Sequence, residues 1–339
     1  MGRGRQPAKS AGFLFFISTE IYKRTYNGYI KINWGVFKMR VGILYDNISG
    51  NTGDVAIGIS VKKILKELKV EFEELVPGRS NPSDYKTIII GGGHLLRPSP
   101  DAYYDSFKVK GMHILNAVGV VGYPDDLHYL NEYLYVTFRS NGDKNKVSYI
   151  KKDCYVVPCT SMLLEDIKEV PVKIEKPCVG IHLLPNQFSA EDEIKFRNWI
   201  SRLPFMVYFI PITHYNNDYS YLEKLSRNMK NVELLPKMGA LEIFTIIGKF
   251  SFFISCSLHG AIFAFVHNVP FILYDTEKMR FFLEDRKLSR YLFSSLEEMM
   301  RLFDNLVKNP PDYSKKLELD KLVLRNHIKN IKEIVGSIR

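Results

Sequence analysis

The sequence predicts an α/β protein built from two doubly wound, Rossmann-like domains that face each other across a cleft. Three observations predict this fold. Short β-branched or aromatic runs alternate with longer amphipathic runs along the chain. The alternation breaks between Pro171 and Pro177, which bracket a polar stretch, and restarts at Cys178. In both halves, loops rich in glycine and polar residues follow predicted strands, and doubly wound sheets bind ligands at such carboxyl ends.

Composition narrows the class of protein. The chain has 339 residues, 46% hydrophobic and 25% charged, which suits two globular domains. Its net charge of +10 is uneven, because residues 1–38 carry seven Lys or Arg and one Glu, which leaves +4 for the rest. The sequence shows no basic stripe interleaved with aromatic residues, so we expect no nucleic-acid partner. Four cysteines without C-x-x-C spacing favour reduced thiols in the cytoplasm. No apolar run approaches the ~20 residues of a membrane span.

The first predicted strand sets the domain boundaries. Met39 directly precedes the strand-like run Arg40–Tyr45, so we expect residues 1–38 to be a non-native or disordered N-terminal extension. An apolar run in this extension hints at a signal peptide, but it is short and lacks a small-residue cleavage site. We expect an N-terminal domain over 39–172 and a C-terminal domain over 173–339.

In the first half, β-branched and aromatic runs predict six strands and an amphipathic run predicts one long helix. The helix covers Val55–Leu68, with apolar residues at helical spacing and Asp54 as the expected N-cap. A short helix is expected over Met162–Val170, before the crossover. The predicted strands are Arg40–Tyr45, Val70–Leu75, Thr87–Ile90, Ala117–Val121, Tyr133–Phe138 and Tyr155–Val157.

The second half repeats this alternation. Its predicted strands are Cys178–Leu183, Phe205–Ile210, Val232–Leu235, Phe252–Ser255 and Phe271–Tyr274. Its predicted helices are Ala190–Ser201, Tyr219–Met229, Ala240–Gly248, a short segment whose first turn holds His259, and the amphipathic tail Lys315–Ile338.

Two loops of the first half carry candidate binding residues. Asn51 and Asp54 lie beside two glycines after the first strand, where they either face a ligand or form a capped βα turn. The triplet Gly91, Gly92 and Gly93 has no Cβ atoms, so a ligand or another backbone segment can approach it closely. The triplet matches neither the G-x-G-x-x-G nor the P-loop pattern.

Arg139 is a third candidate, at the end of a predicted strand. An arginine there can hold a carboxylate or phosphate with two parallel hydrogen bonds. The alternative is a surface arginine paired with Asp143 or Asp153.

The second half holds the most informative segment, in which His259 follows Ser255-Cys256-Ser257 and opens a helix. The first turn of a helix has unpaired N–H groups and a partial positive charge, so it binds anions. A histidine there can contact the anion or move a proton beside it; alternatively, it only caps or packs. An inert Cys256 is the commoner case for a buried thiol.

Two further loops contribute candidates. His214 and Asp218 share the loop after Phe205–Ile210, as an acid–base pair or simply as polar loop residues. Lys278 and Arg280 follow the last predicted strand and would complete an anion pocket, unless Asp275 and Glu277 pair with them. A metal site is not expected, because H-E-x-x-H, D-x-D and clustered Cys/His patterns are absent from the sequence.

Taken together, these residues resemble the polysaccharide pyruvyl transferase family. The match runs in order from about Met39 to Arg286, and the ordered set is more specific than any single motif. It comprises Asn51-Thr-Gly-Asp-Val-Ala56, Gly91–Gly93, Val136-Thr-Phe-Arg139, Val157-Pro-Cys-Thr160, and Ser257-Leu-His-Gly-Ala-Ile-Phe-Ala264 with Asn-Val-Pro270 and Lys278.

The resemblance implies a fold like that of GT-B glycosyltransferases and a cytoplasmic transferase, either free or peripheral at the inner face of the membrane. Members move a pyruvyl group from phosphoenolpyruvate to two hydroxyls of a sugar, which forms a cyclic ketal and releases phosphate. The implied partners are phosphoenolpyruvate and a sugar of a cell-surface polysaccharide or its precursor, lipid-linked or not, with no metal or cofactor. No sequence feature fixes an oligomeric state.

The resemblance also implies roles. His259 would contact the phosphate and act as the acid–base group; its place at a helix N-terminus should disfavour its protonated form. Arg139 and Lys278 would contact the anion, and Ser257 and the glycine triplet Gly91–Gly93 would bind substrate. Asn51 and Asp54 would lie on the acceptor side, with Asp54 as a base, and His214 is a weaker candidate.

Two departures from the family pattern keep other functions open. Ser257 stands where many members carry arginine, and Cys159 stands where an aspartate is common, which motivates a catalytically silent member as one alternative. A GT-B glycosyltransferase that uses a nucleotide sugar is the other alternative, in which Glu277 or Glu284 would hold the ribose.

Overall fold

The protein is described here by a computed structural model, which covers residues 15–17, 20–25, 28–32 and 41–338, with side chains from residue 41 onward. The first three pieces are the strands β1 (Phe15–Ile17), β2 (Glu20–Thr25) and β3 (Gly28–Ile32), which pair as a small antiparallel sheet. The rest of the predicted extension, 1–38, lies outside the described residues. Its non-native or disordered character stays a prediction.

The N-terminal domain contains a parallel sheet of six strands in the order β5-β4-β6-β7-β8-β9. The strand order reverses between β4 and β6, so the loops after these two strands open in opposite directions along the sheet. Its strands are β4 (Val41–Leu44), β5 (Phe72–Leu75), β6 (Thr87–Gly91), β7 (Ile114–Val118), β8 (Tyr135–Phe138) and β9 (Cys154–Val156).

The C-terminal domain contains a second six-stranded parallel sheet, in the order β12-β11-β10-β13-β14-β15. Here the strand order reverses between β10 and β13, which is the arrangement of a dinucleotide-binding fold. Its strands are β10 (Cys178–His182), β11 (Met206–Phe209), β12 (Val232–Leu234), β13 (Phe252–Ser255), β14 (Phe271–Tyr274) and β15 (Leu292–Phe293). The predicted α/β fold with two doubly wound domains is confirmed.

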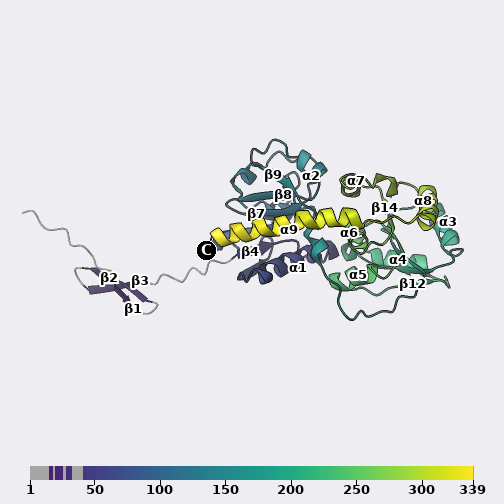
Figure 1. The fold of residues 1–339 in the computed structure, drawn as a ribbon, viewed down its shortest axis with the longest axis horizontal. Helices are drawn as coiled ribbons and strands as arrows, with labels where there is room; N and C mark the ends of the chain where they lie inside the picture. Colours follow the sequence, from purple (N-terminus) through teal and green to yellow (C-terminus); the bar gives the residue numbers. More distant parts are fainter. Residues whose placement is uncertain (1–14, 18–19, 26–27, 33–40, 339) are drawn as a thin grey trace, which may run out of the picture.

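Helices cover both sheets (Figure 1). In the N-terminal domain they are α1 (Thr52–Glu67) and α2 (Asn141–Asn145). In the C-terminal domain they are α3 (Ala190–Ile200), α4 (Asp218–Ser226), α5 (Ala240–Ile247), α6 (Leu258–Val266), α7 (Glu277–Glu284), α8 (Leu296–Lys308) and α9 (Ser314–Ser337). None of the helices among the described residues is both long and apolar enough to cross a lipid bilayer.

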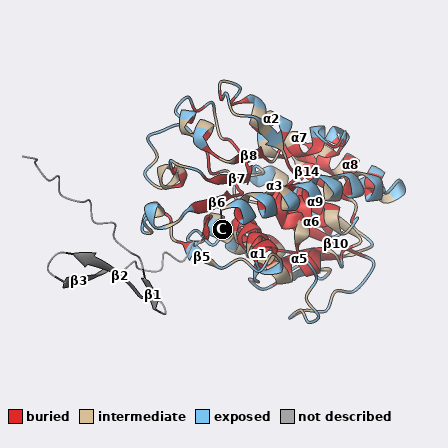
Figure 2. Ribbon diagram, turned by 60° about the vertical axis from the view of Figure 1, so that its left-hand side comes forward, coloured by how far each residue is buried: buried red, intermediate tan, exposed pale blue. Residues whose placement is uncertain are grey.

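One apolar core joins the two domains. The helix α1 packs against α5 and α6 of the C-terminal domain, and its buried residues belong to the same cluster as those of β10–β14. Figure 2 shows the buried residues along the strands and on the inward faces of the helices. A separate cluster fills the other face of the N-terminal sheet. The first turns of α1 and α6 are therefore held close together.

The last helix, α9, returns to the N-terminal domain, and in Figure 1 it runs across both domains. Its buried His327 bonds through Nε2 to the Asn116 Oδ1 atom of β7 at 2.8 Å and through Nδ1 to the Tyr135 hydroxyl of β8 at 3.3 Å. At its beginning, Asp320 accepts an ion pair from Arg286 at 2.7 Å. The tail that the sequence assigned to the C-terminal domain thus contacts both domains; the predicted boundaries at 38 and 172 stay predictions.

Three predicted elements differ clearly from the structure. The strand expected over Ala117–Val121 lies at Ile114–Val118. The helix expected over Met162–Val170 is only a 3-10 turn at Thr160–Leu163. Farther along this segment, the Ile167 N–H donates to the Thr245 hydroxyl of α5 at 3.0 Å instead of to a helical carbonyl. The first helix begins at Thr52, and its N-cap is Asn51 rather than Asp54. Asn51 is the N-cap because its side-chain oxygen accepts the Gly53 N–H at 3.2 Å, whereas Asp54 lies within the first turn of the helix.

Candidate active site

A cavity of about 140 Å³ lies between the domains, at the carboxyl ends of both sheets. The loops that form it follow β4, β6, β8, β11, β13 and β14. They include both loops at the reversal of the N-terminal sheet and one of the two loops at the reversal of the C-terminal sheet. Seven of the ten predicted site residues line this cavity: Asn51, Asp54, Gly93, Arg139, Ser257, His259 and Lys278. Its other lining residues are His94, Leu95, Arg97, Tyr104, Thr213, Tyr215 and Leu258.

The first turn of α1 meets the first turn of α6 in this cavity. A Cβ atom on Gly53 would lie 1.7 Å from the Nδ1 atom of His259, so only glycine lets the two turns approach this closely. Beside it, the Asn51 Nδ2 group donates a hydrogen bond to the Asp54 Oδ2 atom at 2.7 Å. The loop is therefore both a capped βα turn and a wall of the cavity, so the two interpretations of its sequence are compatible.

The glycine triplet after β6 makes room for side chains of α1. Gly92 and Gly93 have φ values of +71° and +69°, and a Cβ atom on Gly93 would lie 2.1 Å from the Asp54 Oδ1 atom. At Gly92 the same atom would meet Ile57 at 2.2 Å. Gly91 and Gly92 do not line the cavity. Gly92 acts indirectly, because it leaves room for Ile57 of α1, whereas a Cβ atom on Gly91 would lie 2.9 Å from the Asn116 amide nitrogen of β7.

Arg139 projects into the cavity from the end of β8. Its Nε atom lies 3.3 Å from the Asp143 carboxylate, so the predicted pair with Asp143 is present, but the Arg139 side chain is buried and not at the surface. Its Nη2 atom is buried and makes no hydrogen bond with the described residues, so part of the guanidinium remains available for an anion. Close approach of this group to the neighbouring strand is possible because residue 119 is glycine, whose Cβ would lie 2.3 Å from Nη2.

His259 is buried in the first turn of α6, where Ser257 is the N-cap and accepts the Gly260 N–H at 3.4 Å. The Nε2 atom of His259 lies 3.7 Å from the Cys159 sulfur. Burial, followed by the positive charges of Arg139 and Lys278, lowers the pKa of His259 to about 3. The ring is therefore neutral at pH 7, as predicted, although burial rather than the helix terminus is the main cause. Burial also raises the pKa of the Cys159 thiol, so a thiolate nucleophile is disfavoured.

Lys278 supplies a second cation from the start of α7. It makes no ion pair or hydrogen bond with any residue between 41 and 338, and burial followed by the charge of Arg139 lowers its pKa. Arg280, which the sequence grouped with Lys278, instead pairs with Asp275 at 3.0 Å at the surface. Two cations, Arg139 and Lys278, thus face the cavity with incomplete compensation, which is the electrostatic signature of an anion site.

Asp54 is the acidic group of the cavity. Burial and the charge of nearby Asp46 raise its pKa to about 7, against the Asn51 hydrogen bond and the charges of Arg139 and Lys278. Its Oδ1 atom is buried without a hydrogen-bond partner among the described residues. Both protonation states are consequently accessible near neutral pH, which suits a group that gives and takes protons.

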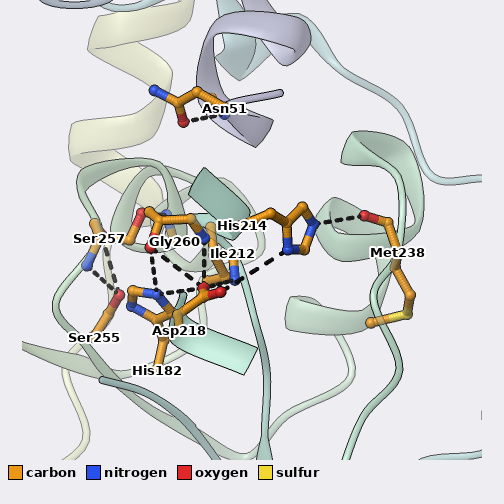
Figure 3. A network of polar contacts seen from close by, with 11 residues as sticks. Asn51, His182, Ile212, His214, Asp218, Met238, Ser255, Ser257 and Gly260 are labelled. Carbon is orange, nitrogen blue, oxygen red and sulfur yellow. Dashed lines mark hydrogen bonds and ion pairs between the residues drawn. The ribbon is translucent and has the colours of Figure 1, made fainter. Parts of the chain in front are cut away.

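His214 does not line the cavity. Its Nε2 atom bonds to the Met238 carbonyl at 3.2 Å, and its Nδ1 atom is 4.0 Å from Asp218 (Figure 3). The main histidine partner of Asp218 is His182, whose Nε2 atom lies 3.2 Å away at the end of β10. The predicted His214–Asp218 pair is therefore the edge of a buried network, centred on His182, that supports the loop between β11 and α4.

Several functional candidates escaped sequence reasoning. Asp46 stands in the same loop as Asn51, and Tyr103 and Tyr104 lie farther along the loop that begins with the glycine triplet, but none of the three belongs to a recognised motif. His94 was noted only as the residue after that triplet. Burial, with the charges of Arg139 and Lys278, lowers the pKa of His94 well below its ordinary value. Asp46 and His94 lie shortly after β4 and β6, and this position was the signal that could have found them. Tyr103 and Tyr104 lie much farther along the loop after β6 and had no such signal.

Comparison with known proteins agrees with this geometry. The sequence model of the family described as polysaccharide pyruvyl transferase matches residues 51–278. A Listeria monocytogenes protein provisionally named a UDP-N-acetylglucosamine 2-epimerase has a similar structure, with a TM-score of 0.58 and 10% identity over 88% of this chain and 97% of that one. The UDP-GlcNAc 2-epimerase from Neisseria meningitidis bound to UDP-GlcNAc gives a TM-score of 0.54 and 12% identity over 86% and 100%. Among proteins with curated functions, none matches the sequence. These structures share a GT-B-like fold with the chain.

Proposed function

Because the chain belongs to the polysaccharide pyruvyl transferase family, and is therefore a transferase, we propose that it moves a pyruvyl group from phosphoenolpyruvate to a sugar. Two hydroxyls of one sugar in a polysaccharide or its precursor would attack the same carbon. The products are a cyclic ketal and inorganic phosphate. The reaction needs cations for the donor, an acid for its methylene carbon and a base for the hydroxyls.

The observation that carries this proposal is the pair of cations in a small cavity. Arg139 and Lys278 face a volume of about 140 Å³ whose nearest carboxyl, Asp54, has a raised pKa. Buried cations without full partners favour an anionic ligand. The phosphate and the carboxylate of phosphoenolpyruvate would pair with Arg139 and Lys278.

Asp54 accounts for the first proton exchange. In its protonated form it gives a proton to the methylene carbon, which becomes a methyl group and leaves an oxocarbenium-like centre at the neighbouring carbon. The resulting carboxylate then takes the proton of the first attacking hydroxyl, which restores the acid. Its pKa of about 7 makes both steps accessible near neutral pH.

His259 accounts for the second exchange. Burial and the charges of Arg139 and Lys278 lower the pKa of His259 to about 3, so the ring is neutral. A phosphate anion bound beside these cations offsets their charge and raises the pKa of the ring, which then accepts a proton. The bond between the ketal carbon and the phosphate oxygen breaks, and phosphate leaves with the electron pair. The second hydroxyl attacks and gives its proton to His259, which passes it to the phosphate. The scheme balances without a metal or cofactor.

The alternative function, a glycosyltransferase, would need Glu277 or Glu284 to hold the ribose of a nucleotide sugar. Glu277 pairs with Lys146 at 2.5 Å, and Glu284 is exposed on α7. For the acceptor we propose a sugar precursor in the cytoplasm, where phosphoenolpyruvate is made, free or linked to a lipid at the inner membrane face.

The test compares ligands and measures turnover. Thermal unfolding is followed with phosphoenolpyruvate, UDP, UDP-GlcNAc or phosphate, and phosphate release is assayed with phosphoenolpyruvate and a panel of glycosides. We expect phosphoenolpyruvate to raise the unfolding temperature more than phosphate does, and UDP compounds to have no effect. Stabilisation by UDP compounds alone would support the glycosyltransferase. Stabilisation by none of them would support a silent member of the family.

A further inference from the structure

Two tyrosines from opposite domains lie at the mouth of the cavity. Tyr104 comes from the 3-10 turn Tyr104–Phe107 after β6, and Tyr215 comes from the 3-10 turn His214–Asn216 after β11. Both line the cavity that contains Asp54. Tyr215 is 50% exposed, so its ring is not part of the core and its position needs another explanation.

Tyr104 is held rigidly by its neighbours. The Arg97 guanidinium lies over its ring, 3.3 Å from the centroid, and the Tyr103 ring packs against it edge to face at 5.1 Å. Tyr103 is itself fixed, because its hydroxyl donates to the Asp46 carboxylate at 2.5 Å. A preorganised aromatic ring contacts a ligand with little loss of conformational entropy.

The loop that carries Tyr215 is held by the buried network of Figure 3. The Asp218 Oδ2 atom accepts the Ile212 N–H at 2.7 Å and the Thr213 N–H at 2.6 Å, and His182 lies 3.2 Å from the same atom. These contacts fix the backbone on one side of Tyr215, and the bond between His214 and the Met238 carbonyl fixes its immediate neighbour. An exposed aromatic side chain on a firmly held loop is typical of a binding contact.

The charged groups of the cavity fall into two sets. The cations Arg139 and Lys278 line it together with the ring of His259. Asp54 is the negative group, and burial followed by the charge of Asp54 raises the pKa of Tyr215. Asp54 therefore shares the cavity with the anion-binding groups and is electrostatically coupled to both rings. A hexopyranose has an apolar C–H face that packs on aromatic rings and hydroxyls that bond to phenols and carboxylates.

We propose that Tyr104 and Tyr215 form the acceptor subsite, which binds a hexopyranose between the two domains with its reacting hydroxyls toward Asp54. This inference rests on the proposed function and adds the chemical class of the acceptor and the residues that recognise it. Because one ring comes from each domain, a bound sugar contacts both walls of the cleft.

The test measures sugar binding directly, so it does not depend on turnover. Saturation-transfer NMR with methyl hexopyranosides (galactoside, glucoside and mannoside) is applied to the wild type, Tyr104→Ala, Tyr215→Ala, Tyr215→Phe and Tyr155→Ala. Tyr155 is the matched control, because it is also 50% exposed and lines a different cavity. Phosphoenolpyruvate affinity is measured in parallel by calorimetry.

We expect at least one glycoside to bind the wild type and each Ala variant of the pair to weaken it about tenfold, the value of one well-placed aromatic contact. Tyr215→Phe should keep most of the affinity, Tyr155→Ala all of it, and every variant should bind phosphoenolpyruvate as the wild type does. Unchanged glycoside binding in both Ala variants, or no glycoside binding to the wild type, would overturn the subsite. Glycoside binding without phosphoenolpyruvate binding would overturn the proposed donor and leave the subsite intact.

Discussion

The C-terminal domain buries His182 with Asp218, and the cavity buries Asp54 and His259. The surroundings shift the pKa values of the two aspartates in opposite directions. His182 and Asp218 face each other in the C-terminal domain, where hydrogen bonds from His182, Thr213 and Ile212 overcome burial and hold the pKa of Asp218 at about 2. Asp54 and His259 face the cavity instead, and burial raises the pKa of Asp54 to about 7. A carboxylate with several donors is fixed as an anion, whereas one with few donors can exchange protons.

The histidines differ in the same way. Burial lowers the pKa of both, but His182 has a carboxylate partner at 3.2 Å and His259 has two cations nearby and a thiol at 3.7 Å. The first arrangement stabilises a loop, and the second leaves a neutral ring open to a ligand. Partners, more than burial, separate a structural histidine from a functional one.

The largest effect is expected from His259→Ala. Loss of the proton acceptor should reduce kcat for phosphate release by about 10²- to 10⁴-fold. The free energy of unfolding should fall by about 1–3 kcal/mol, because the ring is buried and its removal leaves a cavity. Initial rates at saturating phosphoenolpyruvate and thermal unfolding measure the two effects.

The matched control for this variant is His267→Ala. His267 is the C-cap of the same helix, α6, and contacts Asp166 at 3.5 Å, away from the cavity. Its kcat should stay within about threefold of the wild type. Equal activity of His259→Ala and wild type would remove His259 from the reaction and erase the contrast between the two histidines.

Much of the cavity could be predicted from sequence because its residues sit in short loops directly after strands. Asn51, Asp54, Arg139, His259 and Lys278 were all placed at strand ends, and parallel sheets bring such ends together. The glycine triplet was found by composition, but its use was not, because close packing of Asp54 and Ile57 against Gly93 and Gly92 depends on contacts distant in sequence.

The remaining features depend on contacts that no local pattern encodes. His182 ends an ordinary hydrophobic strand, and its partner is 36 residues away. His327 lies on an amphipathic helix, yet its ring reaches Asn116, which is 211 residues away. The sequence instead paired His214 with Asp218, because neighbours in sequence are the only pairs that a single sequence displays.

The next effect concerns stability and comes from Asp218→Asn. In the wild type, the Asp218 carboxylate accepts the N–H groups of Ile212 and Thr213, and the asparagine side chain lacks its negative charge. We therefore expect the free energy of unfolding to fall by about 3 kcal/mol. Asp312→Asn is the control, because that carboxylate also accepts from Ser314 and Asn268 but is exposed; its effect should be much smaller. Urea unfolding followed by tryptophan fluorescence measures both.

The same carboxylate predicts an acid dependence. The pKa of Asp218 falls from 3.8 to about 2 on folding, so its contribution to stability is present above pH ~4 and is lost as the pH drops toward 2. In Asp218→Asn this part of the acid transition should disappear. An unfolding free energy equal to that of the wild type at pH 7 would show that the network does not stabilise the loop.

The smallest effect, and the sharpest comparison of the two carboxylates, is the pH profile of Asp46→Asn. Asp46 is buried at the end of β4, and its charge is the second cause, after burial, of the raised pKa of Asp54. Since the protonated form of Asp54 is the proposed acid, kcat/KM of the wild type should decline as the pH rises through about 7. Removal of the neighbouring charge should lower the pKa of Asp54 and move this decline to lower pH.

Tyr103→Phe separates charge from hydrogen bonding in this experiment. It removes the hydroxyl that Asp46 accepts at 2.5 Å but keeps the Asp46 charge, so the decline should stay near pH 7 while the level of activity changes. If Asp46→Asn leaves the midpoint in place, charge from Asp46 does not set the pKa of Asp54. The difference between Asp54 and Asp218 would then rest on hydrogen-bond donors alone, since Asp218 has three donor residues and Asp54 has only the amide of Asn51 within residues 41–338.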